Sequence, residues 1–267
     1  FINNYYFLEI AMLNTTKQFA NNCPTKNSKE GRFGVYFAPS GSSLLNTLGS
    51  GWLGRDTTKK KKTLQPIVSG LSAQRLCELT QSPRHYGFHA TLKAPFQLVN
   101  WGERDGLDRA IETVCAPIKP FSISLVINQL AGFFALTLGT HSPKIHHLAD
   151  VLVSELDIFR SPNTSEDIQR RRAAGLNSQQ NNNLLRWGYP YVFSEFRFHM
   201  TLTSRITSEE ERKRLETAAR VHFLPILKKK IMVNSVCLFY QTDKNSQFEL
   251  IKRFKLGENG PKGTQRK

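Results

Sequence analysis

Two short stretches of this chain carry the same polar motif inside the same apolar alternation. They read Phe88-His89-Ala90-Thr91-Leu92 and Phe198-His199-Met200-Thr201-Leu202. Alternation with a period of two predicts a β-strand at each position, with the apolar side chains facing a core and each His sharing the opposite face with its Thr. A chain that makes such a face twice is expected to bring two half-sites together.

The composition describes an ordinary globular protein with a strong positive charge. Of its 267 residues, 39% are hydrophobic and 22% are charged, and the formal net charge is +16. No apolar run approaches the ~20 residues that a membrane-spanning helix needs. The four cysteines are scattered without a CxxC pair, which favours a reducing compartment. We therefore expect a cytoplasmic monomer that does not bind membranes, with a charge that favours phosphate substrates or RNA.

The sequence divides into three segments. Residues 1–30 show no sustained period and are expected to form a poorly ordered extension, and residues 257–267 are expected to form a basic tail. Residues 31–256 alternate strand-like and helix-like stretches. From each motif onward the pattern predicts a strand, a helix and two further strands, which is a structural repeat. The second motif strand is expected to run from Arg197 to Arg205, and Pro83 is expected to end a helix over 72–80.

Two imidazoles on facing strands can divide acid and base work between them. The unperturbed pKa of histidine is about 6.5, so near neutral pH one ring can accept a proton while the other donates one. This division suits in-line displacement at phosphorus, where the attacking and leaving groups lie on opposite sides. We predict that His89 and His199 are catalytic, and the sequence leaves open which of them is the base. Thr91 and Thr201 lie roughly 6.5 Å further along their strands and are expected to bind the phosphate oxygens.

Several cations lie near the motifs. The strand period puts Lys93, Arg197 and Arg205 on the histidine faces, and we expect them to bind phosphate. Because Arg197 and Arg205 lie at opposite ends of their strand, one of them is expected to be structural. Arg55 or Arg84 is expected to reach the site from a loop.

Aromatic and other histidine residues complete the set of candidates. Tyr86, Trp52 and Tyr191 are candidates to stack on a base or sugar, with core packing as the alternative for Trp52. His85 either lines the site or packs beside it. A single His-x-Thr is usually only part of a half-exposed strand, whereas two matching copies favour a functional site. The histidines assigned to the surface or to packing are His141, His146, His147 and His222.

The paired motifs resemble the two signatures of the two-histidine (2H) phosphoesterase superfamily. Within it, the flanking sequence resembles a bacterial branch labelled as phosphonate metabolism proteins, over about residues 32–256. The stretches that carry this narrower resemblance are 32–39, 51–56, 86–96, 186–193 and 196–205. The resemblance implies an α+β fold with two pseudo-symmetric, interleaved lobes, each with an antiparallel sheet and helices, and an active cleft between them. It also implies a phosphodiesterase that uses no cofactor and no metal.

Three functions agree with these motifs. The first is a metal-independent phosphoesterase acting on a small cyclic phosphodiester, such as a ribose or nucleotide cyclic phosphate, in phosphonate metabolism. The second is an RNA-end processing enzyme, either a 2',3'-cyclic phosphodiesterase or a 2',5' ligase-like enzyme, which the +16 charge favours. The third is a non-catalytic nucleotide or RNA binder. Intact motifs in both halves count against the third, because binding alone needs no acid/base pair.

Overall fold

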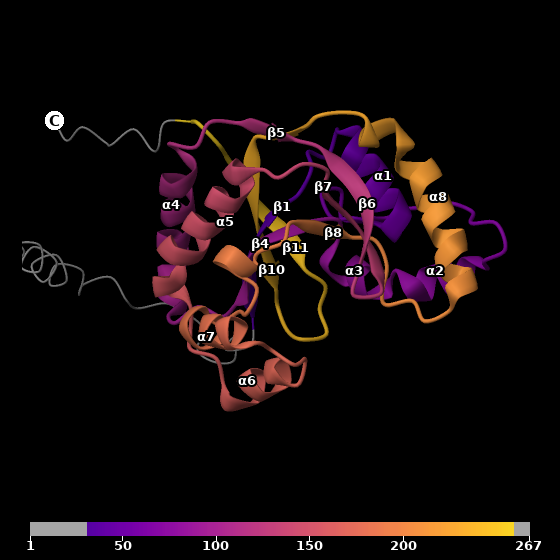
Figure 1. Ribbon diagram of the computed structural model, residues 1–267. Helices are drawn as coiled ribbons and strands as arrows, with labels where there is room; N and C mark the ends of the chain where they lie inside the picture. The colour runs from indigo at the N-terminus through magenta and orange to yellow at the C-terminus, as the bar shows by residue number, and fades with distance from the viewer. Residues whose placement is uncertain (1–30, 259–267) are drawn as a thin grey trace, which may run out of the picture.

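The computed structural model describes residues 31–258, so the expected extension over 1–30 and most of the expected tail lie outside the described residues. In Figure 1, helices lie to the left and to the right of the central strands. The strands are β1 (Arg32–Phe37), β2 (Arg55–Asp56), β3 (Lys61–Lys62), β4 (Ala90–Phe96), β5 (Phe121–Ile123), β6 (Leu125–Leu130), β7 (Phe133–Leu138), β8 (His199–Thr201), β9 (Ile231–Val233), β10 (Ser235–Gln241) and β11 (Glu249–Lys255).

The α-helices cover the two ends of the sheet. They are α1 (Leu44–Leu53), α2 (Ala73–Leu79), α3 (Gln81–Tyr86), α4 (Arg104–Cys115), α5 (Pro143–Glu155), α6 (Ser165–Arg172), α7 (Ser178–Trp187) and α8 (Glu209–Leu227). Short 3-10 turns are formed by Trp101–Glu103, Asp157–Phe159 and Phe193–Glu195. In Figure 1, α4 and α5 lie on the left of the sheet and α1 and α8 on the right, while α6 and α7 lie below.

The main sheet has seven strands in the order β11-β10-β1-β4-β8-β7-β6, and their pairings are antiparallel. This confirms the expected α+β class. From β4 the chain runs through α4, β5, β6 and β7, and from β8 it runs through α8, β9, β10 and β11. The expected repeat is therefore present, with each half containing one additional short strand, and β5 pairs with β9.

Each motif strand lies nearer the last two strands of the other half of the repeat, which are β6 and β7 in the first half and β10 and β11 in the second. β8 pairs with β7, whereas β4 is separated from β10 only by β1. The two parts of the sheet are joined by one residue pair, Ala90 with Met200, so the strands form one continuous sheet rather than two separate ones. The division into two facing lobes stays a prediction.

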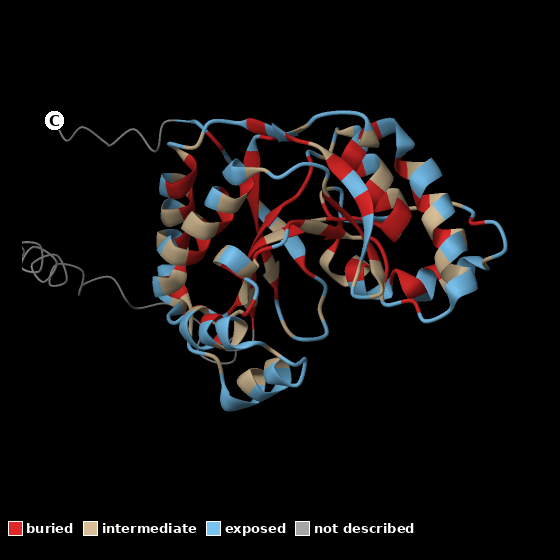
Figure 2. Cartoon of the chain, viewed as in Figure 1, coloured by how far each residue is buried: buried red, intermediate tan, exposed pale blue. Residues whose placement is uncertain are grey.

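The core lies mainly on one face of the sheet. Helices begin and end where the local sequence supplies caps. For example, the Ser43 side chain accepts a hydrogen bond from Asn46 N at the start of α1, and Gly54 ends the helix with a φ of 81°. Figure 2 shows buried residues concentrated in the strands and on the inward sides of the helices, whereas α6 is largely exposed. A smaller apolar cluster on the other face contains Tyr36, Phe239 and Phe248.

Two sequence-based expectations about local structure are wrong. Pro83 lies inside the first turn of α3 rather than ending a helix, since the missing N–H of proline costs nothing in a first helical turn. The second motif strand covers only His199–Thr201, because the chain before it forms the turn at Phe193–Glu195. The second motif therefore forms a short strand between β4 and β7.

Candidate active site

The two motifs lie side by side at the centre of the sheet. Ala90 pairs with Met200, and both side chains are fully buried. His89 and His199, one residue before each of them, are half-buried on the opposite face. The predicted alternation is confirmed at these positions. In this antiparallel register Thr91 stands opposite His199, and His89 stands opposite Thr201.

A glycine turn delivers the first motif to the sheet. Gly87 follows α3 with a φ of 83°, a conformation that favours glycine. A Cβ at this position would lie 2.1 Å from Cγ2 of Thr57. The chain can therefore turn directly from α3 into the strand only with glycine here.

Both histidines hold their rings in the same way. The Nδ1 of His89 lies 2.9 Å from the carbonyl oxygen of Gly87, and the Nδ1 of His199 lies 2.8 Å from the carbonyl oxygen of Arg197. A carbonyl oxygen only accepts, so each Nδ1 carries a proton and donates it. The proton that each ring gains or loses is therefore at Nε2. In the sequence the acceptor is the backbone two residues before each histidine, which a side-chain motif does not reveal.

The environment of His89 favours its neutral form. Its ring lies between aromatic rings, with centroids 4.2 Å from Tyr36 and 5.6 Å from Tyr86. Burial lowers the pKa of His89 to about 4, and the nearby His199 lowers it further, against the opposing hydrogen bond to Gly87. At neutral pH the Nε2 of His89 therefore has a free lone pair, as a general base requires.

The motif threonines lie beside the imidazoles. The Thr91 hydroxyl is 3.3 Å from the Nε2 of His89. Thr201 is half-buried and pairs with Ala135 of β7. Thr203, two residues further on, has a different role, because its buried hydroxyl accepts a hydrogen bond from the backbone N–H of Phe134. Only the first two hydroxyls are placed to contact a ligand at the histidines.

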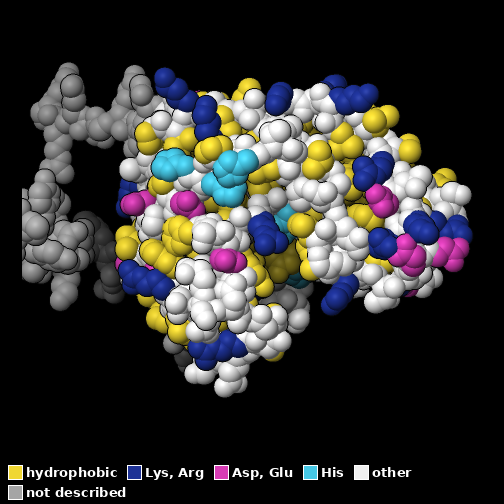
Figure 3. All heavy atoms as spheres, viewed as in Figure 1, with side chains coloured by type: hydrophobic (Ala, Val, Ile, Leu, Met, Phe, Trp, Pro, Cys, Tyr) yellow, Lys and Arg dark blue, Asp and Glu magenta, His cyan; other side chains and the backbone are white. Residues whose placement is uncertain are grey.

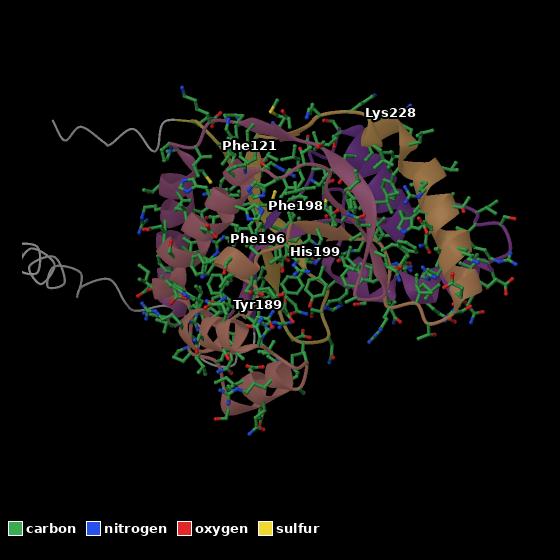
Figure 4. The ribbon with its side chains drawn as sticks, in the orientation of Figure 1. Phe121, Tyr189, Phe196, Phe198, His199 and Lys228 are labelled. Atoms are coloured by element: carbon green, nitrogen blue, oxygen red, sulfur yellow. The ribbon has the colours of Figure 1, made fainter. Side chains whose placement is uncertain are left out.

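A cavity of about 480 Å³ opens beside the motifs, and its wall includes Thr91, His199, Tyr191 and Arg197. Figure 3 shows histidine atoms deep in a hollow near the centre of the view, with basic side chains at its margin. In Figure 4, Tyr189 lies below His199, and both belong to this wall. The cavity combines an apolar floor with a few polar groups, which is typical of small-ligand sites.

Of the predicted phosphate-binding cations, the structure places only Arg197 in this wall. Arg205 is exposed and its side chain lies against Gly132, in the turn between β6 and β7. A structural role for Arg205 stays a prediction. Arg55 and Arg84 do not reach the cavity, because their guanidinium groups donate to backbone carbonyls, including those of Phe248 and Leu53 respectively.

The prediction for Lys93 is wrong. Its side chain is 3% exposed, and its Nζ donates to the carbonyl oxygen of Val153 at 3.0 Å and lies 3.7 Å from a carboxylate oxygen of Asp157. Irregularities in the pairing of β4 with β1 cause this, because Thr91 pairs with Tyr36 whereas Lys93 pairs with Val35. The extra residue on β4 between Thr91 and Lys93 puts Lys93 on the face opposite to that of Thr91, and a second irregularity follows before Phe96.

The aromatic candidates separate into two groups. Trp52 is fully buried, and its Nε1 donates to the carbonyl oxygen of Leu202, so the stacking role proposed for it is wrong. Tyr191 is 40% exposed in the wall of the cavity. Tyr86 is half-buried against the ring of His89. His85 packs beside the site, where its Nε2 lies 2.9 Å from the side-chain nitrogen of Gln241.

Sequence reasoning missed two residues of the site. Tyr36 packs on His89, and its buried hydroxyl has no hydrogen-bond partner among the described residues. Tyr189 lines the cavity and is coupled electrostatically to Tyr86. The alternation of Phe33, Val35 and Phe37 indicates that Tyr36 faces away from the main core, but nothing local indicates that its neighbour is His89.

Within residues 31–258, no cluster of three or more His, Cys, Asp or Glu side chains could hold a metal ion. No helix in the same range is both long and apolar enough to span a membrane.

Two His-x-Thr motifs therefore lie paired at the centre of one antiparallel sheet, as their matching sequences predicted. The chain belongs to the family described as "Protein of unknown function (DUF1045)", whose sequence pattern matches residues 91–249.

Two curated relatives share the name ribose 1,5-bisphosphate phosphokinase PhnN. The one from Janthinobacterium sp. (strain Marseille) is 38% identical over 66% of this chain and 39% of its own length. The one from Laribacter hongkongensis (strain HLHK9) is 32% identical over 82% of this chain and 50% of its own length. The chain thus spans half or less of the length of these relatives.

Solved structures with a similar fold include E. coli LigT complexed with 3'-AMP. It is 13% identical with a TM-score of 0.42, and the match covers 86% of this chain and 99% of that one. Kluyveromyces marxianus Usb1 is 12% identical with a TM-score of 0.36, and its match covers 86% of this chain and 99% of that one.

Proposed function

We propose that this protein is a phosphoesterase that opens a cyclic phosphodiester by two-histidine acid/base catalysis, without a metal ion or cofactor. The observation that carries the proposal is the matched presentation of His89 and His199. Both rings are anchored at Nδ1, both leave Nε2 for proton transfer, and each stands opposite the threonine of the other motif. A protein that only binds nucleotides or RNA has no need of this arrangement.

The lowered pKa of His89 supports the role of base for His89 and leaves the role of acid to His199. His89 is neutral at physiological pH, so its Nε2 takes a proton from the attacking water as the water oxygen bonds to phosphorus. The Nε2 of His199 donates a proton to the ester oxygen as the bond from that oxygen to phosphorus breaks. Thr91 and Thr201 donate hydrogen bonds to the non-bridging oxygens. The product is a phosphomonoester with a free hydroxyl on the neighbouring carbon.

We favour a ribose cyclic phosphate as the substrate. The matching relatives are named for a kinase of ribose 1,5-bisphosphate, and this chain matches half or less of each. Opening a cyclic phosphate of ribose produces a ribose phosphate, which is the class of compound that such a kinase uses. This connection supports the role in phosphonate metabolism that the motifs indicate by resemblance.

The test is turnover of a panel of cyclic phosphates by the purified protein in the presence of EDTA. Cyclic phosphates of ribose, nucleoside 2',3'-cyclic phosphates and RNA with a 2',3'-cyclic end should be compared by phosphorus NMR. We expect ring opening of a ribose-based compound that persists in EDTA. Absence of turnover throughout, or turnover that EDTA abolishes, would overturn the proposal.

The +16 net charge supports an RNA-end processing enzyme as the second candidate. A protein that contacts several phosphates of RNA loses affinity steeply as salt rises. Turnover of cyclic-ended RNA should therefore fall sharply between 50 mM and 200 mM salt under this alternative, whereas turnover of a small cyclic phosphate should change little.

A further inference from the structure

A second cavity, of about 550 Å³, lies beyond Tyr86 from the catalytic histidines. Its wall is formed by the start of β1, the end of α3, the end of β4, the segment 161–164, α6 and the turn before β11. Arg32, Arg171 and Lys244 contribute positive charge to this wall, which also contains Glu166 and the ion pair of Asp167 with Arg170. None of the three forms an ion pair with a carboxylate anywhere in residues 31–258.

Arg32 is held in place by a neutral group. Its Nε and Nη2 donate to the side-chain oxygen of Gln241 at 2.9 and 2.5 Å, and its guanidinium lies 5.6 Å from the ring centroid of Phe248. Gln241 is buried and is itself fixed by a hydrogen bond to the carbonyl oxygen of Ser246. Only the Nε and Nη2 of Arg32 donate to Gln241, so the guanidinium has further N–H donors for an anion.

Arg171 is held in the same manner on the other side of the cavity. Its guanidinium lies 4.8 Å from the ring centroid of Tyr189. The nearby Asp167 accepts hydrogen bonds from Arg170 and Thr164 and so is already partnered, while Glu166 is exposed on α6. Burial lowers the pKa of Arg171, and the like charges of Arg170 and Arg32 lower it further, whereas Tyr189 and Asp167 raise it. Like charges fixed near one another are stabilised by a bound anion.

Two tyrosines separate this cavity from the catalytic one. Tyr86 lines the basic cavity, and its ring is stacked on His89 at 5.6 Å. Tyr189 lines the catalytic cavity and carries Arg171 on its face. Tyr86 thus contacts both His89 and the basic cavity, so one tyrosine ring lies between a ligand at the histidines and this cavity.

We propose that this basic cavity binds a terminal phosphomonoester of the substrate, so the preferred substrate is a cyclic phosphodiester that carries a second phosphate on the same sugar. The inference rests on the proposed function for the identity of the reacting group. The anion site itself depends only on Arg32, Arg171 and their neutral anchors.

The test separates the two proposals. Ribose 5-phosphate is titrated into the full-length protein by calorimetry, and turnover is measured on adenosine 2',3'-cyclic phosphate with and without a 5'-phosphate. We expect Arg32→Gln and Arg171→Gln each to weaken ribose 5-phosphate binding and to raise KM for the 5'-phosphorylated substrate about tenfold. KM for the substrate without the 5'-phosphate should not change. Arg109→Gln, on the exposed face of α4, is the matched control.

Arg171→Gln keeps the test decisive if Arg32→Gln fails to fold, because Arg171 lies on the peripheral helix α6. Equal KM values for the two substrates, together with ribose 5-phosphate binding that neither variant changes, would overturn the anion site. If no cyclic phosphate is turned over but ribose 5-phosphate binds in an Arg32- and Arg171-dependent way, the anion site stands and the catalytic proposal fails.

Discussion

His89 and His199 leave the same nitrogen, Nε2, free of the backbone, because the Nδ1 of each donates to the carbonyl oxygen two residues before it. The backbone of each strand thus fixes the tautomer of its own histidine. The enclosure of His89 by Tyr36 and Tyr86 keeps its ring neutral. One imidazole is prepared to accept a proton, and the other is left to donate one.

Replacing either catalytic histidine should nearly abolish turnover. His89→Ala removes the base and His199→Ala the acid, so each should lower kcat about 10²-fold or more with the fold intact. His147→Ala, on the exposed surface of α5, should keep wild-type turnover. Stopped-flow or NMR assays of the cyclic substrate measure this. Near wild-type kcat in either cleft variant would remove the acid/base pair from the mechanism.

The motif threonines and Thr203 should respond differently to loss of the hydroxyl. Thr91→Val and Thr201→Val should raise the activation barrier by ~1–3 kcal/mol while leaving the melting temperature nearly unchanged. Thr203→Val should instead lower the melting temperature, because the N–H of Phe134 loses its buried acceptor. Steady-state kinetics and thermal unfolding of the three variants make the comparison. A purely structural effect at Thr91 would contradict the phosphate-binding role.

His89 should make stability depend on pH below neutrality. Its pKa is about 4 in the folded protein and about 6.5 when unfolded, so the unfolded state takes up the proton first as pH falls. The contribution of the neutral ring is complete above about pH 6.5 and is lost as pH falls toward 4, by up to about 3 kcal/mol. The free energy of unfolding, measured by urea titration between pH 7 and 4.5, should fall less steeply with decreasing pH in His89→Gln than in the wild type. The same pH dependence in the variant and the wild type would mean that the pKa of His89 is not lowered by folding.

Lys93 should affect stability and not substrate affinity. Asp157→Asn leaves the buried ammonium without its counter-charge, and it should destabilise the protein by about 3 kcal/mol. Lys93→Met should cost less, and adding it to Asp157→Asn should recover part of the loss, since the buried ammonium is then removed and only Arg160 still lacks its carboxylate partner. Urea unfolding of the wild type, the two single variants and the double variant measures the interaction energy between Lys93 and Asp157. A raised KM in Lys93→Met without loss of stability would restore the phosphate-binding role.

The period of two was sufficient to predict both motif strands and the face of their histidines. It failed at Lys93, because its position depends on how β4 pairs with β1, and the irregularity between Tyr36 and Val35 has no local signature. The stacking role of Trp52 failed for a related reason, since its partner, the Leu202 carbonyl, belongs to the other half of the chain. Pattern reasoning thus located the chemistry, whereas the residues that enclose it are set by contacts between distant segments.

The pairing of Ala90 with Met200 sets the register between β4 and β8, and with it the positions of the two histidines. A slip of one residue between β4 and β8 would turn Met200, which is fully buried, toward solvent and His199 into the core. The cost of exposing that methionine therefore keeps the second imidazole in the cleft. Substitutions that loosen the core beneath the sheet should therefore misalign the two histidines and lower turnover before they unfold the protein.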